Sequence, residues 1–181
     1  RQDGLLVWST YFAEAPSAVI SMDHDPQGRL VIAGSELAGI PDEQVTPPVG
    51  AEDYDPAGAG DAFIAMFNND DQIMWSTLYG GSASDLANNV RCTNNTIVLG
   101  GNTSSDNMPS SPGPSGAYHE PFVGPDAAFI AEFNSSGALI WTTYLWGTGG
   151  DELGYRGLDI SPGSNDIYLS GVSNGGALDI V

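Results

Sequence analysis

The sequence predicts an all-β fold, and three observations carry this prediction. The 181 residues include 24 glycines and 12 prolines, which favours strands joined by tight turns. Few apolar residues recur at helical spacing, so we expect almost no helix. The stretch "DAFIAMFNNDDQIMWSTLYGG" at 61–81 is nearly repeated as "DAAFIAEFNSSGALIWTTYLWG" at 126–147. A fold built from one repeated unit explains this duplication.

The period of the repeat is visible in single residues. Trp8, Trp75 and Trp141 lie 67 and 66 residues apart, and Gly34 and Gly101 keep the same step of 67. Phenylalanine and aspartate series stay in phase with them. Four independent series in one phase are not expected by chance, so the repeat measures about 66–67 residues.

Each repeat contains four short apolar runs separated by turn residues such as "DPQG" and "NSSG". Consecutive strands with short links pair antiparallel, so each unit is expected to be a meander. The predicted first strands are 17–25, 86–93 and 153–161, the second strands 29–35, 96–102 and 166–172, the third strands 61–68 and 127–134, and the Trp-containing fourth strands 74–79 and 140–145.

A four-stranded unit of this length fits a blade of a β-propeller better than a sandwich of repeated hairpins, which is the alternative. Runs such as "AFIAMF" are apolar at consecutive positions, as expected where both sheet faces are buried. Because both ends of the chain fall inside a repeat, we expect a partial propeller. Its predicted parts are an outer strand of a preceding blade at 1–12, blades at 17–80 and 86–147, and the first half of a further blade at 153–181.

The two long copies, extended to "GSASDLANNV" and "GTGGDELGY", resemble the SBBP repeat of bacterial β-propellers. Units of that family carry D-A-F-hydrophobic-A, then N-x-x-G, W-S-T-Y-L-G-G, an acidic turn and a strand ending in V-x-G. The segment "SSDNMPSSPGPSGAY" at 104–118 is similar to the family's linker, whereas 36–55 departs from it. The resemblance implies a non-enzymatic structural or adhesive protein, secreted by a bacterium or displayed on its surface.

The charge of the chain limits its partners. Asp and Glu number 23 against four arginines, and the net charge is −19. Such a chain repels phosphate backbones and anionic lipid, so we expect no nucleic-acid partner and no membrane insertion. The carboxylates are interpreted as a solubilising surface, with Ca²⁺ binding as the alternative. Cys92, the only cysteine, is expected to be a buried structural thiol.

The best candidates for a binding role lie in two long connections, 35–60 and 102–125. In a four-stranded meander these connections emerge on the same face as the link into the next unit. They are interpreted either as packed linkers or as a face that binds a protein or glycan. The possible contact residues are Tyr54, Tyr118, His119 and Phe122.

No set of residues predicts catalysis. The string "GVSNG" at 171–175 matches a nucleophile elbow, but no helical pattern follows it. His24 and His119 lack the spacing of a zinc site. We therefore predict no catalytic residue, no metal site and no cofactor. The alternative is a carbohydrate-binding or glycan-processing propeller that uses the long-loop face, and the remaining blades of the same or another chain are the other expected partner.

Overall fold

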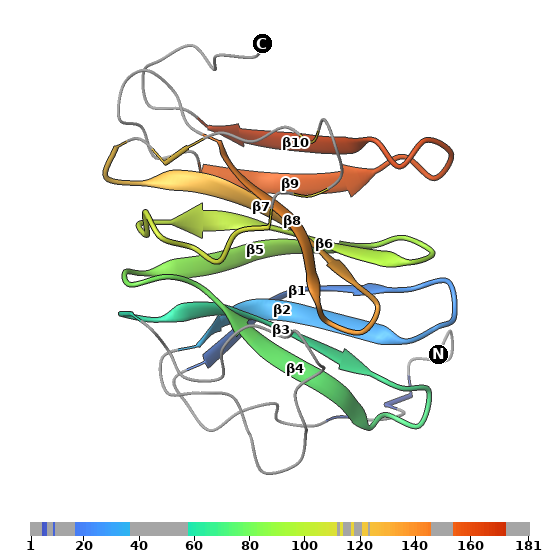
Figure 1. The fold of residues 1–181 in the computed structure, drawn as a ribbon. Helices are drawn as coiled ribbons and strands as arrows, with labels where there is room; N and C mark the ends of the chain where they lie inside the picture. Colours follow the sequence, from blue (N-terminus) through green and yellow to red (C-terminus); the bar gives the residue numbers. More distant parts are fainter. Residues whose placement is uncertain are drawn as a thin grey trace.

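The computed structural model of the chain describes residues 17–36, 58–111, 124–145 and 154–172, together with positions 5, 6, 9, 113, 117, 121 and 122. Every helix or strand in this part of the chain is a strand, which confirms the all-β prediction (Figure 1). Each of the ten predicted strands is present, and each end is within one residue of its predicted position. The expected outer strand at 1–12 lies outside the described residues except for positions 5, 6 and 9, so it stays a prediction.

The strands form three antiparallel sheets. Sheet 1 has the order β1-β2-β3-β4 and contains β1 (Ser17–His24), β2 (Leu30–Glu36), β3 (Asp61–Phe67) and β4 (Ile73–Tyr79). Sheet 2 has the order β5-β6-β7-β8 and contains β5 (Asp85–Cys92), β6 (Thr96–Thr103), β7 (Ala127–Asn134) and β8 (Leu139–Leu145). Sheet 3 pairs β9 (Gly154–Ile160) with β10 (Ile167–Val172). The four-stranded meanders predicted from the repeat are therefore confirmed.

The three sheets are stacked, with sheet 2 between the other two (Figure 1). One apolar cluster joins sheets 1 and 2, and its largest buried members include Ile64, Tyr79, Phe129 and Phe133. A second cluster joins sheets 2 and 3 through side chains such as Ile130. Both faces of sheet 2 are therefore buried, as the consecutive apolar residues predicted. The described sheets form an open stack and do not close into a ring or a barrel.

Irregularities of the strands also repeat from sheet to sheet. Each first strand has a β-bulge at the same place, which leaves one extra residue, Ile20, Asn88 or Arg156, without a partner. A second bulge lies at Met74 in β4 and at the equivalent Ile140 in β8. Since bulges fix register and twist, the equivalent residues of the sheets can be matched one to one.

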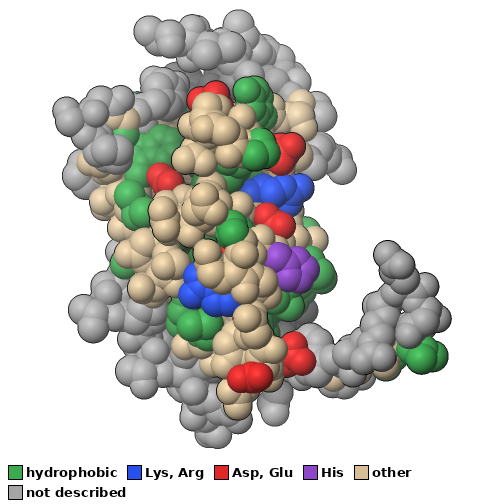
Figure 2. Space-filling view, turned by 90° about the vertical axis from the view of Figure 1, so that its right-hand side faces the viewer, with side chains coloured by type: hydrophobic (Ala, Val, Ile, Leu, Met, Phe, Trp, Pro, Cys, Tyr) green, Lys and Arg blue, Asp and Glu red, His purple; other side chains and the backbone are tan. Residues whose placement is uncertain are grey.

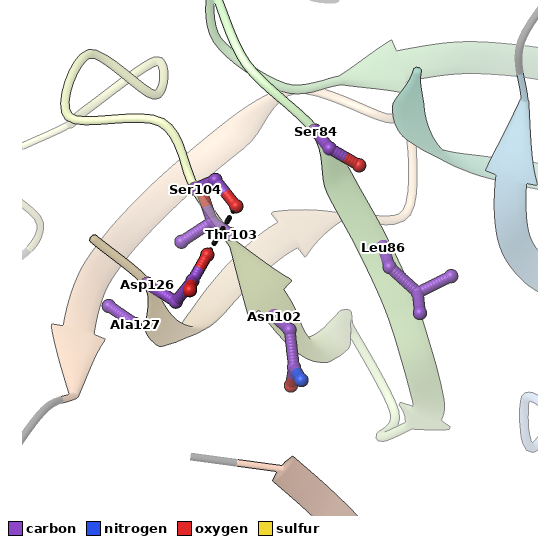
Figure 3. A pocket seen from close by; sticks show the side chains of 7 residues that line it. All are labelled: Ser84, Leu86, Asn102, Thr103, Ser104, Asp126 and Ala127. Carbon is purple, nitrogen blue, oxygen red and sulfur yellow. Dashed lines mark hydrogen bonds between the residues drawn. The ribbon is translucent and has the colours of Figure 1, made fainter. Parts of the chain in front are cut away.

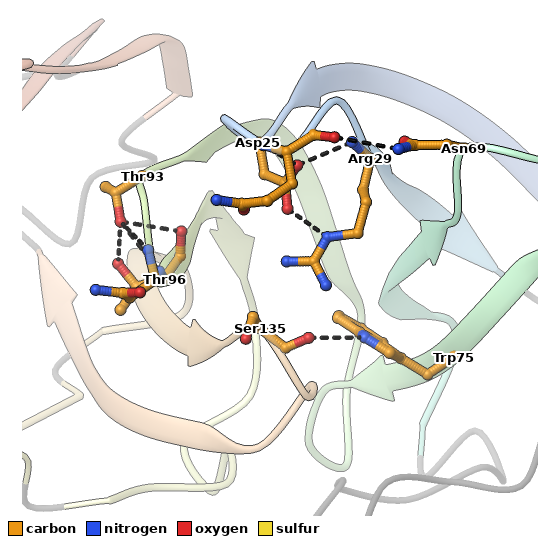
Figure 4. A network of polar contacts seen from close by, with 9 residues as sticks. Asp25, Arg29, Asn69, Trp75, Thr93, Thr96 and Ser135 are labelled. Atoms are coloured by element: carbon orange, nitrogen blue, oxygen red, sulfur yellow. Dashed lines mark hydrogen bonds and ion pairs between the residues drawn. The ribbon is translucent and has the colours of Figure 1, made fainter.

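Side-chain caps explain where the hairpins turn. Asn68 Oδ1 accepts hydrogen bonds from the backbone N–H groups of Asp70 and Gln72, at 2.9 and 3.0 Å. The equivalent Asn134 makes the same two contacts in the next sheet, at 2.8 and 3.0 Å. Asp25 caps the β1–β2 turn and also pairs with Arg29 Nε at 2.5 Å (Figure 4). Each strand ends at such an Asx turn, because the side-chain oxygen accepts backbone N–H groups in place of a carbonyl of a neighbouring strand.

One contact of Figure 4 ties two sheets together at this end. The indole N–H of Trp75 in β4 donates to the carbonyl of Ser135, in the β7–β8 turn, at 3.2 Å. Trp75 is 4% exposed and lies in the cluster between sheets 1 and 2. Trp75 is therefore a packing residue.

Candidate binding face at the long connections

Three connections meet at one end of the sheets, namely β2–β3, β4–β5 and β6–β7. Asp85 N donates to Gly60 O at 2.8 Å, and Gly60 and Ser84 form a parallel bridge. Ser104 N donates in turn to Ser84 O at 2.9 Å. The expectation that the long connections share one face is therefore confirmed at their described ends. We call this end the long-connection face.

The β4–β5 turn is held from inside by a buried carboxylate. Asp85 is 1% exposed, and its Oδ2 accepts the backbone N–H of Gly81 at 2.7 Å and the Ser105 hydroxyl at 2.9 Å. Asn107 Oδ1 accepts the N–H of Ser82 at 2.9 Å. The start of the β6–β7 connection is thereby fastened along the turn, which gives this part of the face a defined shape.

A second buried carboxylate lies beside the first. Asp61, at the start of β3, is 2% exposed. A methyl group placed on Gly80 would collide with Asp61 Oδ1 and lie 2.8 Å from Asp85 Oδ2, so both carboxylates abut the same glycine. Burial raises the pKa of Asp85 above its ordinary value of 3.8, and hydrogen bonds from Thr103, Gly81 and Ser105 oppose this shift.

A pocket opens at the same end of sheet 2, with a cavity volume of about 170 Å³ (Figure 3). The Ser104 hydroxyl donates to Asp126 Oδ1 at 2.5 Å, and Asn88 donates to Asn102 Oδ1 at 3.2 Å. The pocket thus offers one carboxylate, hydroxyl groups and an amide. It is lined by Ser84, Leu86, Asn102, Thr103, Ser104, Asp126 and Ala127.

The chemistry of this pocket suits a polar ligand. A glycoside hydrolase uses two carboxyl groups that flank the bond to be cleaved. Among the residues that line the pocket, Asp126 is the single carboxylate. Its oxygens and the neighbouring hydroxyl groups can hold a hydroxyl or an amide of a ligand.

The structure describes one of the four predicted contact residues. Phe122 is half-buried and packs edge-on against Tyr144, with the ring centroids 5.3 Å apart. The Tyr144 hydroxyl accepts the backbone N–H of Met108 at 3.0 Å. Phe122 therefore helps to fix the β6–β7 connection onto β8. Tyr54, Tyr118 and His119 lie outside the described residues.

Sequence reasoning did not select the residues of the pocket. Ser104 and Asp126 stand at the two ends of one long connection, 22 residues apart, and only the fold brings them together. Asp85 did show a signal, since it follows a glycine-rich turn and recurs as Asp151. The pattern could have indicated a structural carboxylate at this turn.

The opposite face carries the short hairpin turns. Figure 2 views the molecule from the side on which these turns lie in Figure 1, and hydrophobic, acidic and basic side chains alternate there without a continuous patch of one kind. Half-buried Cys92 lies toward this end of β5, where burial and the charges of Asp23 and Asp25 raise the pKa of its thiol to about 12. A thiol of this kind is neutral at physiological pH and is a poor nucleophile.

Neither a cluster of metal-ligating side chains nor a membrane-spanning helix is found in the described ranges. No three His, Cys, Asp or Glu side chains in them are close enough together to hold a metal ion. None of the elements in these ranges is a helix long and apolar enough to cross a membrane.

The chain was also compared with known proteins. No protein-family model matches it, and no curated protein is significantly similar to it.

Proposed function

We propose that the chain is a segment of a β-propeller that serves as a non-enzymatic structural or adhesive module. The observation that carries this proposal is the repeated packing of one sheet on the next through equivalent residues. In a propeller each blade covers its neighbours in this way, and about four to eight blades close the ring. The remaining blades would come from the same or another chain.

The proposed location is outside the cell or on the surface of a bacterium. The resemblance to the SBBP repeat is the main support. The net charge of −19 keeps such a module soluble and separate from anionic membranes. Its single cysteine means that folding needs no internal disulfide, and the raised pKa of Cys92 protects the thiol from oxidation.

The proposed partner face is the long-connection face. Connections that are long and held by a rigid scaffold are where proteins commonly place binding residues. Asp85, Ser105 and Asn107 accept backbone N–H groups of the β4–β5 turn, and these hydrogen bonds hold the described part of this face in one arrangement. A face that is already ordered loses little conformational entropy on binding.

A glycan is the second candidate ligand, and the pocket beside Asp126 favours it. Its volume of about 170 Å³ suits part of one sugar ring, and the carboxylate can accept hydrogen bonds from sugar hydroxyl groups. Since the pocket lining holds a single carboxylate, we propose recognition of the sugar without cleavage.

The proposal is tested by coating beads with the chain and measuring their retention on surfaces of collagen, fibronectin, mucin and arrayed glycans. Retention is expected on at least one protein surface, with loss after Tyr54→Ala or Tyr118→Ala in the long connections. Loss after Asp126→Asn on a glycan surface would assign the pocket. Asn69→Ala, on the opposite face, is the matched control and should leave retention unchanged.

Two results would contradict the proposal. One is hydrolysis of chromogenic glycosides that disappears with Asp126→Asn, because it would make the chain an enzyme. The other is retention that Asn69→Ala abolishes and the variants of the long connections do not change.

A further inference from the structure

The contact between sheets 1 and 2 shows how one first strand is seated on the preceding sheet. Ala87 and Val90 of β5 are fully buried in the cluster that joins the two sheets. Two side chains of β1 accept backbone N–H groups of β5. Ser21 Oγ accepts from Val90 at 3.1 Å, and Asp23 Oδ2 accepts from Cys92 at 2.9 Å. In this contact the apolar side chains of β5 point backward, toward sheet 1. The polar side chains of β1 point forward, toward sheet 2.

The apolar part of this arrangement is found again one sheet further on. Leu158 of β9, equivalent to Val90 by strand register, is 3% exposed and packs on Val98 and Ile130 of sheet 2. Arg91, which holds the position of Asp23, places its Nε 3.9 Å from Asp159 Oδ1 of β9. The apolar contact therefore recurs at both junctions, whereas the polar one differs, because the backbone N–H of Ile160, equivalent to Cys92, donates to Asp159 Oδ1 of its own strand at 3.0 Å.

At β1 the residues equivalent to the buried Ala87 and Val90 are exposed. Val19 pairs with Gly34 as Ala87 pairs with Gly101, yet it is 45% exposed. Met22 is equivalent to Val90 and is 60% exposed. Ile20, the bulge residue between them, is 46% exposed. Val19 and Met22, whose equivalents Ala87 and Val90 are both buried against sheet 1, form one open patch, which we call the β1 patch.

At the other end of the stack the forward-pointing residues are exposed. Asp159 is equivalent to Asp23, and its side chain is 83% exposed. Tyr168 on β10 is 59% exposed, whereas its equivalents Val31 and Val98 are buried. β9 and β10 therefore present a carboxylate that can accept a hydrogen bond, next to an aromatic ring that can cover the apolar side chains of the β1 patch.

We propose that the β1 patch binds the β9–β10 surface of a second copy of the chain, head to tail. The Asp159 carboxylate of one copy would accept the backbone N–H of His24 of the next, as Asp23 does for Cys92. In the single chain this N–H is held by the residue's own neighbour, Asp23 Oδ1, at 2.8 Å. A contact between two different surfaces propagates, so it gives a ring or an open stack.

This inference rests on the blade architecture proposed above, but not on what the long-connection face binds. The apolar patch supplies the attraction, and the net charge of −19 on each copy opposes it. Because salt screens charges that are exposed, association should strengthen with ionic strength.

The test is analytical ultracentrifugation of the chain over a range of concentrations at physiological ionic strength. The mass is expected to rise from 18.8 kDa to at least twice that value. Met22→Asp and Tyr168→Asp should each weaken association at least about tenfold, because each places a charge in the contact. Met74→Asp is the matched control, since this methionine on β4 is 42% exposed but lies outside the β1 patch. Met22→Gln provides a milder variant if Met22→Asp does not fold.

Mixing the two variants gives the decisive readout. Met22→Asp keeps an intact β9–β10 surface and Tyr168→Asp keeps an intact β1 patch, so an equal mixture should form dimers and stop there. A chain that stays monomeric at every concentration overturns the proposal. Self-association of Tyr168→Asp with the strength of the original chain would also overturn it, because the patch would then bind itself. Either result leaves the bead retention assay unaffected, so the two proposals fail separately.

Discussion

Sheets 1 and 2 follow the same plan, but they differ where their neighbours differ. Phe63 in β3 and Phe129 in β7 occupy equivalent positions, and both are fully buried. The two strands differ near the end of their pairing, where Met66 of β3 corresponds to Glu132 of β7. Met66 is fully buried between the two four-stranded sheets, whereas half-buried Glu132 faces the side covered by β9 and β10. The comparison teaches that the residue type changes where the neighbour differs, because Met66 faces a four-stranded sheet and Glu132 faces the pair β9 and β10.

Replacing the glycine at the close contact between the first and second strands of a sheet should give the largest loss of stability. A methyl group at Gly101 would overlap the Leu86 carbonyl oxygen and lie 2.7 Å from Phe129 Cε1. Gly34, its equivalent in sheet 1, has the same crowding from Ala18 and Phe63. We expect Gly101→Ala to lower the free energy of unfolding by about 3 kcal/mol, measured by urea denaturation.

The adjacent Gly100 is the control for this prediction. A methyl group there would meet Leu158 Cδ2 at 3.7 Å, which is an ordinary contact, and sheet 1 already has Ala33 at the equivalent place. Gly100→Ala should therefore be neutral or should stabilise by up to about 1 kcal/mol. Equal losses of unfolding free energy in the two variants would contradict the prediction, because only Gly101 is crowded by the neighbouring strands.

Tyr79 marks the second difference between the sheets, because sheet 2 has Leu145 in its place. The Tyr79 hydroxyl lies 2.7 Å from Thr142 Oγ1 and 3.0 Å from Pro109 O, so it links β4 to sheet 2. Tyr79→Phe should lower the free energy of unfolding by about 1–2 kcal/mol, since buried polar partners lose a hydrogen bond. Thermal unfolding measures the change.

The exposed Tyr168 provides the comparison for the loss of a hydroxyl group. Tyr168→Phe should leave the melting temperature nearly unchanged, because the Tyr168 hydroxyl is exposed to water in both the folded and the unfolded state. A loss as large as that of Tyr79→Phe would refute the link between the sheets as its cause.

The buried carboxylate at the β4–β5 turn gives a dependence on pH. The pKa of Asp85 is raised in the folded state, so between 3.8 and that raised pKa the folded state keeps a proton that the unfolded state has released. Stability due to this group is therefore full below 3.8 and declines as the pH rises through this interval. Asp85→Asn removes the titration, and its loss of stability relative to the original chain should shrink as pH rises.

The measurement is the melting temperature of both chains from pH 3 to pH 7, compared at each pH. The asparagine can still accept the Gly81 N–H through its carbonyl oxygen, so the variant is expected to fold. A difference that grows with pH would mean that the folded-state pKa is lowered, against the effect of burial.

The sequence predicted the strands well, because their boundaries depend on local chemistry. Asn68 and Asn134 end their strands through hydrogen bonds to residues two and four positions further on. Such short-range contacts leave a readable pattern. The stacking of sheets could also be expected, since runs such as 62–67 are apolar on both sides and are buried throughout.

The candidate site was harder to predict because it depends on contacts across the long connections. Ser104 and Asp126 form the pocket only after β6 and β7 have paired. The sequence predicted aromatic residues of those connections as contact residues instead, and Phe122 is packed against Tyr144. Composition alone cannot separate an aromatic ring that packs a loop from one that meets a partner.

The smallest expected effect compares two turns that differ by one residue. Asp71 in the β3–β4 turn has φ of 60°, and its equivalent in the β7–β8 turn is Gly137, with φ of 83°. Glycine adopts this left-handed region without the Cβ clash that an aspartate meets. Asp71→Gly should therefore stabilise the chain by about 0.5 kcal/mol, and Gly137→Asp should destabilise it by a similar amount. Asp70→Gly removes the same charge from a residue that is not in this conformation, so it should not stabilise; if it matched Asp71→Gly in urea denaturation, relief of charge repulsion rather than backbone conformation would explain the gain.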